Sequence, residues 1–179
     1  MDATEEAGKA INLIYYSQAE GGFKVSAEAE ALLNSFKTKV GVIAVAGMYR
    51  TGKSFLLNRI LLNKKGECGF GVGPTINPCT KGIWVWSQPL EAEINGEKMP
   101  VLLMDSEGLG AITEDQNHDT RIFMLALLLS SFFIYNSMGT IDENALQQLS
   151  LIVNLSKQLQ VKAEAMGESD PEEIARYFP

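Results

Sequence analysis

The sequence is poor in cysteine and in basic residues. It has only two cysteines, Cys68 and Cys79, which are not a closely spaced pair of the metal-binding type and are too few for a disulfide framework. Lysine and arginine number 15 against 22 acidic residues, giving a formal net charge of -7. This balance argues against a nucleic-acid-binding face and against contact with an anionic membrane through this segment. We therefore expect free thiols, no nucleic-acid partner and no membrane contact.

Long apolar runs are also missing. The most membrane-like stretch is residues 122–135, which is shorter than the roughly 20 residues that a membrane-spanning helix needs, so it indicates core. Residues 1–6 are acidic and lack the basic and apolar regions of a signal peptide, which favours a cytoplasmic location. The length and a hydrophobic content of 46% predict one globular domain over 1–179.

Residues 47–54 fit the pattern of Gly, four residues, then Gly-Lys-Ser. An apolar run at 40–46 predicts a buried parallel strand before them, and 55–62 predicts a helix after them, which is the context that a phosphate-binding loop requires. Gly47 and Gly52 would let backbone N–H groups point at phosphate oxygens. Lys53 would add a charge for the outer phosphates, and the Ser54 hydroxyl would bind magnesium. The alternative interpretation is a chance match that forms only a turn.

The remaining pattern alternates strands and helices. The segments with strand character are 10–16, 24–25, 83–89, 92–94, 98–105 and 132–137, with a hairpin turn at 95–96. Helical spacing occurs at 26–37, 120–130 and 141–160, and Ser26 is a good N-cap for the first. Glycines and prolines make 63–82 a long irregular loop, which we interpret as a mobile switch, and the polar stretch 110–119 predicts a second, solvated loop.

Asp105 follows the predicted buried strand 101–104. In phosphate-loop enzymes an aspartate in this place holds magnesium opposite the loop's hydroxyl residue, and a glycine three positions later, here Gly108, offers its N–H to the terminal phosphate. The alternative for Asp105 is a strand-end turn residue. His118, the only histidine, is interpreted as a surface or capping residue rather than as a general base.

Four segments in this order resemble the guanylate-binding protein family of large, dynamin-related GTPases: 47–54, 78–86, 103–110 and 129–141. The resemblance extends from about Ala10 to the end of the sequence. It implies an α/β fold of the phosphate-loop NTPase type, in three layers, with a mixed, mostly parallel central sheet flanked by helices. It also implies GTP and GDP as substrate and product, Mg²⁺ as cofactor, and a homodimer formed through the nucleotide face.

The resemblance further implies roles for individual residues. Arg50 matches an internal arginine finger, whose alternative is a surface arginine, and Thr80 matches a switch threonine that binds magnesium and positions water. Glu107 matches a residue of the water or proton network. The implied catalytic set is Arg50, Lys53, Thr80 and Glu107, and the magnesium set is Ser54, Thr80 and Asp105. The implied nucleotide contacts come from Gly47, Tyr49, Arg50, Thr51, Gly52, Lys53, Ser54, Phe55 and Gly108.

Two features depart from the family pattern. Pro78 stands where some members have a serine that contacts the attacking water, so the route of the proton is open. No Arg-Asp pair, which the family uses to recognise guanine, occurs in the sequence. We therefore expect the front part of a GTPase domain, without its carboxyl-terminal strands. The alternative function is a fragment that binds nucleotide or protein weakly without turnover; an ATPase or kinase is disfavoured by the switch segments.

Overall fold

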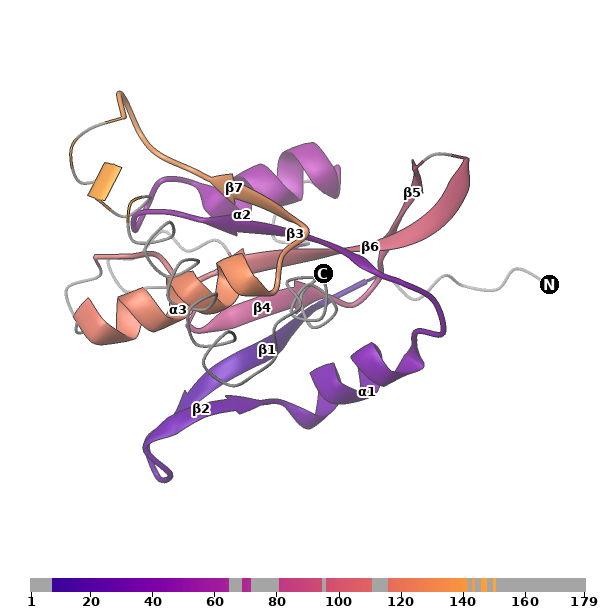
Figure 1. The fold of residues 1–179 in the computed structure, drawn as a ribbon, viewed down its shortest axis with the longest axis horizontal. Helices are drawn as coiled ribbons and strands as arrows, with labels where there is room; N and C mark the ends of the chain where they lie inside the picture. The colour runs from indigo at the N-terminus through magenta and orange to yellow at the C-terminus, as the bar shows by residue number, and fades with distance from the viewer. Residues whose placement is uncertain are drawn as a thin grey trace, which may run out of the picture.

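The computed structural model describes residues 8–64, 69–71, 81–94, 96–110 and 116–141, together with 143, 146, 147 and 150. Within this part of the chain, seven strands form one sheet with helices on both faces (Figure 1). The predicted three-layer α/β class is thereby confirmed, and the cores on the two faces are built from alternating residues of the same strands.

The sheet is mixed. Its hydrogen-bonded order is β2-β1-β4-β6-β3-β7, and β5 pairs with β6 outside this path. Only the pairings of β3 with β6 and with β7 are parallel, yet β1, β3, β6 and β7 all run in the same direction, opposite to β2, β4 and β5. The strands are β1 (Ala10–Ser17), β2 (Gly22–Val25), β3 (Gly41–Ala46), β4 (Ile83–Trp86), β5 (Leu90–Ile94), β6 (Glu97–Ser106) and β7 (Phe132–Tyr135).

Alternation along β6 separates the two cores. Leu102 and Met104 belong to a core that includes residues of α1 (Ala27–Ser35) and α3 (Gln116–Leu128). Leu103 belongs to the other core, with Leu57 of the short helical pair α2 (Lys53–Leu56) and η1 (Leu57–Leu61). Because successive side chains of a strand point to opposite faces, an unbroken apolar run such as 101–104 identifies a strand covered on both sides.

The first helix begins as predicted. Ser26 is its N-cap, and the Ser26 hydroxyl accepts a hydrogen bond from the Ala29 N–H at 3.1 Å. The same hydroxyl donates to the Asn12 carbonyl at 2.5 Å. The cap therefore also ties α1 to β1, and α1 ends at Ser35, two residues before the predicted end.

The helix after the phosphate loop differs from the prediction. It begins at Lys53 rather than at residue 55, and its second half, η1, is a π-helix in which the Leu62 N–H donates to the Leu57 carbonyl at 3.0 Å. In this turn Asn58 is buried. Its side-chain amide donates to the Phe70 carbonyl at 2.9 Å and accepts from the Phe70 N–H at 2.7 Å. The widened turn thus carries a polar anchor for residues 69–71.

Two other predictions were wrong in part. Residues 116–119 are not a solvated loop, because α3 begins at Gln116. The strand near 132–137 is not buried: it ends at Tyr135, it lies at one end of the described sheet order, and Phe132 is 63% exposed. Most of 63–82 and of 141–160 lies outside the described residues, so the switch loop and the last helix stay predictions. None of the described helices is long and apolar enough to cross a membrane.

Candidate functional site

The candidate site lies where the parallel strands β3 and β6 end side by side. Their register pairs Val45 with Asp105, and the chain continues from β3 through the predicted phosphate loop into α2. Ser54, in the first turn of α2, donates its hydroxyl hydrogen bond to Asp105 Oδ2 at 2.5 Å, and Asp105 is fully buried. The predicted pairing of Ser54 with Asp105 across the sheet edge is therefore present.

Lys53 is the buried cation of the site. Only 7% of Lys53 is exposed, and its Nζ donates to the Met48 carbonyl at 3.1 Å. Burial lowers the pKa of the Lys53 ammonium below its ordinary value of 10.5, and the nearby charges of Asp105 and Glu107 oppose that shift only in part. The fold thus holds a cation in a poorly solvated place, where an additional anion would stabilise it.

The phosphate loop is held from the side of β7. Asn136 follows β7; its side-chain amide donates to the Thr51 carbonyl at 2.8 Å and to Thr51 Oγ1 at 3.2 Å. Gly47 has φ +148°, and a Cβ at this position would lie 2.1 Å from the Asn136 carbonyl oxygen. A side chain is therefore excluded at Gly47 by the close approach of Asn136.

The other side of the loop is held by the segment after β6. The Tyr49 N–H donates to the Leu109 carbonyl at 2.8 Å, and the Leu109 N–H donates to the Gly47 carbonyl at 3.1 Å. A Cβ on Gly108 would lie 2.6 Å from Tyr49 Cα and 3.0 Å from Lys53 Nζ. Gly108 is consequently required by packing against the phosphate loop, in addition to the phosphate contact predicted for it.

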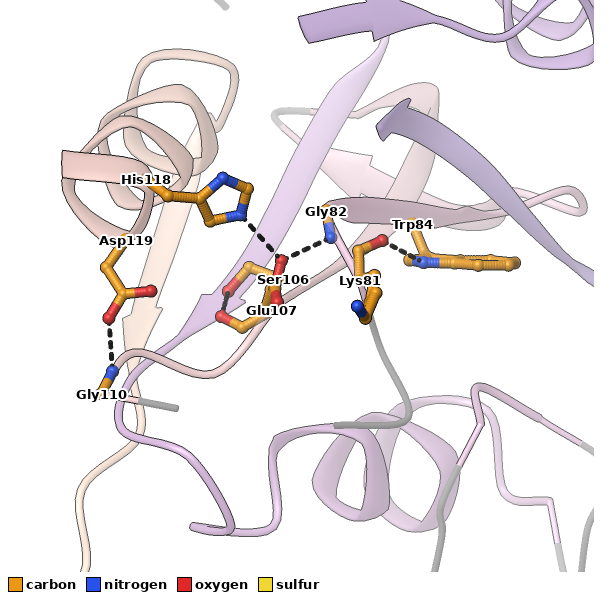
Figure 2. Close-up of polar contacts among 8 residues, drawn as sticks. All are labelled: Lys81, Gly82, Trp84, Ser106, Glu107, Gly110, His118 and Asp119. Atoms are coloured by element: carbon orange, nitrogen blue, oxygen red, sulfur yellow. Dashed lines mark hydrogen bonds and ion pairs between the residues drawn. The ribbon is translucent and has the colours of Figure 1, made fainter. Parts of the chain in front are cut away.

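Glu107 connects this edge to the start of β4. Its Oε2 accepts from the Gly82 N–H at 2.8 Å and lies 3.2 Å from His118 Nε2, as Figure 2 shows. The backbones of Glu107 and Gly82 are also joined, through a hydrogen bond from the Glu107 N–H to the Gly82 carbonyl at 2.8 Å. The Glu107 carboxylate is thus a fixed, buried group at the junction of β4, β6 and α3.

The remaining predicted site residues are less tightly joined. Arg50 is exposed, has φ +62°, and forms no hydrogen bond or ion pair with another described residue. Phe55 is 54% exposed, and Arg59 lies over its ring at 5.5 Å from the centroid, so no described contact joins Phe55 to the buried cluster. Thr80 and Pro78 lie outside the described residues, and their predicted roles stay predictions.

Sequence reasoning assigned no role to Asn136 and misplaced His118. The sequence did contain an indication that Asn136 belongs to the site, because Asn136 is a polar residue that directly follows a strand parallel to β3. The sequence pattern around His118 contained no such indication. Only 14% of the His118 side chain is exposed, because α3 starts early enough to bring it against Glu107 and the β1–β2 hairpin.

The donor set suits magnesium. Ser54 and Asp105 offer a hydroxyl and a carboxylate, the oxygen ligands that this ion prefers. A cluster of three or more His, Cys, Asp or Glu side chains able to hold a metal is not found among the described residues.

Comparison with known proteins gives a consistent result. The family model described as "Guanylate-binding protein, N-terminal domain" matches residues 20–179. Guanylate-binding protein 7 of Mus musculus is 39% identical over 159 residues, which cover 87% of this chain and 24% of the relative. Guanylate-binding protein 1 of Chlorocebus aethiops is 39% identical over 165 residues, with 89% and 26% covered. For guanylate-binding protein 2 of Homo sapiens the values are 38% over 163 residues, 89% and 27%. The chain thus spans about a quarter of the length of these curated relatives.

Proposed function

Because the chain belongs to the guanylate-binding protein family, we propose that it binds GTP at the end of β3 and β6 and contributes to its magnesium-dependent hydrolysis. The observation that carries this proposal is the group formed by buried Lys53 and buried Asp105 with the partly buried Ser54, where α2 starts beside the end of β6. A cation, a hydroxyl and a carboxylate at the end of a phosphate loop are the parts that phosphoryl transfer requires.

In this proposal the loop binds the phosphates and Lys53 neutralises the outer ones. A phosphate beside Lys53 would supply the negative charge that burial makes favourable, since burial already lowers the pKa of this ammonium. Ser54 and Asp105 would hold Mg²⁺, with Thr80 as the further predicted ligand. When bound, the ion supplies charge neutralisation for the β- and γ-phosphates.

The nucleophile in this proposal is water. A bond forms between the water oxygen and the terminal phosphorus, the bond from that phosphorus to the bridging oxygen breaks, and the water proton passes into the polar network around Glu107. Support comes from Glu107 Oε1, which is buried and has no hydrogen-bond partner among the described residues. Arg50 would stabilise the charge on the transferred group.

Arg50 is exposed in the structure, so it must be brought onto the nucleotide. We propose that a second copy of the protein, docked over the nucleotide face, does this by covering the loop and displacing Arg50 inward. Light scattering of the full-length protein with GDP and aluminium fluoride should then show a dimer. Persistence of the monomer in the presence of this transition-state analogue would contradict the proposal.

Phosphate release by the full-length protein tests the main proposal. Lys53→Ala and Arg50→Ala should each lose activity, while the exposed residues Lys98 and Arg121 supply matched Lys98→Ala and Arg121→Ala controls. Turnover by Lys53→Ala and Arg50→Ala at the wild-type rate would refute it. Titration of the 179-residue chain with fluorescent GDP and ADP tests the binding-only alternative, in which the phosphates alone are recognised and both nucleotides bind weakly and about equally.

A further inference from the structure

The contact between His118 and Glu107 joins a partly buried side chain to a buried one. His118 Nε2 lies 3.2 Å from Glu107 Oε2, and the two side chains are 14% and 3% exposed. Oε2 already accepts a hydrogen bond from the Gly82 N–H, and the His118 tautomer with its hydrogen on Nε2 supplies a second donor to the same oxygen. In that tautomer the polar contact is directional, from α3 to the residue that follows β6.

The partners of Glu107 all lie at one of its two carboxylate oxygens. Oε2 accepts from His118 and from the Gly82 N–H, whereas Oε1 has no hydrogen-bond partner among the residues that the structure describes (Figure 2). With two donors on Oε2, rotation of the carboxylate group would break two hydrogen bonds. If the Gly82 N–H were the only donor, rotation would break one hydrogen bond, and Oε1 and Oε2 could exchange positions more easily.

His118 is itself held in place. It lies in the first turn of α3, and its ring packs against Tyr16 and Phe23 of the β1–β2 hairpin, with ring centroids 5.8 Å and 5.4 Å away. Asp119, the next residue, accepts a hydrogen bond from the Gly110 N–H and so ties the start of α3 to the segment after Glu107. The donor thus comes from a packed ring on a tethered helix end rather than from a mobile side chain.

We propose that His118 is a positioning residue for Glu107. By donating to Oε2, it fixes the carboxylate so that Oε1 is the oxygen left for the reacting water. The inference rests on the hydrolysis proposed above, because positioning matters only if Glu107 acts on water. It assigns to α3 and the β1–β2 hairpin a role in orienting the hydrolytic network, although neither element carries a group of the phosphate or magnesium site.

Two substitutions separate the donor from the ring. His118→Phe keeps an aromatic ring against Tyr16 and Phe23 but removes the N–H, and His118→Gln keeps an N–H donor of similar reach but removes the ring. For the full-length protein we expect His118→Phe to lower kcat for GTP about 10-fold with KM changed less than about twofold, since misplacement of a reacting group affects the chemical step. His118→Gln should retain most of the wild-type kcat. The melting temperature should not rank the two variants as kcat does, because His118→Phe keeps the ring packing that His118→Gln loses.

A second measurement does not depend on turnover. Hydrogen exchange at the Gly82 amide reports on the carboxylate that accepts from it. We expect about 10-fold faster exchange in His118→Phe than in wild type, and near-wild-type exchange in His118→Gln. The inference would be overturned if wild type and His118→Phe had the same Gly82 exchange rate and the same kcat. It would also be overturned if His118→Phe and His118→Gln lost kcat equally and in proportion to their loss of Tm. If wild type does not hydrolyse GTP, the proposed function fails instead, and the Gly82 exchange still decides whether His118 positions Glu107.

Discussion

Residues 47–54, the predicted phosphate loop, contain two cations in different environments. Lys53, at the start of α2, is only 7% exposed, and its ammonium group donates a hydrogen bond to the Met48 carbonyl. Three residues earlier, Arg50 is exposed, with a left-handed backbone conformation, and makes no polar contact with the described residues. In the proposed function, Lys53 is therefore preorganised by the fold for binding phosphate, whereas Arg50 must move onto the nucleotide before it acts on the chemical step.

Arg50→Ala is the variant that should change turnover most. In its proposed role as an arginine finger, loss of the Arg50 side chain should lower kcat about 10³-fold, because the charge that develops on the transferred phosphoryl group loses its partner. Affinity for GDP should stay within about threefold, since Arg50 is not part of the buried binding group. Single-turnover phosphate release and calorimetric titration would measure the two effects. A comparable loss of GDP affinity would place Arg50 with Lys53 and remove the distinction.

Lys53→Met should give the opposite profile. The substitution keeps most of the side-chain length but removes the charge beside the outer phosphates, so GTP affinity should fall about 100-fold. Calorimetric titration with a non-hydrolysable GTP analogue would measure it, with the exposed Lys98→Met as control. Unchanged affinity would show that the loop backbone alone holds the phosphates.

Asn136→Ala should weaken nucleotide binding about 10-fold. The loss of two hydrogen bonds to Thr51, worth about 1 kcal/mol or somewhat more in sum, would loosen the loop between Arg50 and Lys53. The same titration measures it, and Asn34→Ala on the exposed side of α1 is the matched control. Wild-type affinity in Asn136→Ala would mean that the Leu109 contacts suffice to shape the loop.

The smallest expected effect is a pH dependence of stability without nucleotide. Because the pKa of Lys53 is lowered in the folded state, the unfolded chain binds more protons between that lowered pKa and 10.5. The free energy of unfolding of wild type, relative to Lys53→Met, should therefore rise as the pH approaches 10.5 and fall as the pH is lowered through the folded-state pKa. Urea denaturation of both proteins between pH 7 and 10 would measure the difference. A difference that falls with rising pH would contradict the burial of a charged Lys53.

Local patterns were sufficient for much of the fold. The strand before the loop, the Ser26 cap and the strand ending at Asp105 were predictable, since each depends on a few neighbouring residues. The start of α3 and the π-helical turn at Leu57–Leu61 were not. In both places a polar side chain, the partly buried His118 or the buried Asn58, makes contacts with residues distant in the sequence.

The family, the phosphate-loop motif and the pairing of Ser54 with Asp105 could be predicted from the sequence alone. The family follows from four segments in a characteristic order, and the pairing follows from the motif and from where parallel strands end. Tertiary packing was needed to establish that Lys53 is buried while Arg50 is exposed, that Asn136 bonds to Thr51, and that His118 lies against Glu107. The physical reason is that burial and side-chain hydrogen bonds depend on which distant segments pack together. A local pattern records the residue that can make a contact, but not the partner that the fold supplies.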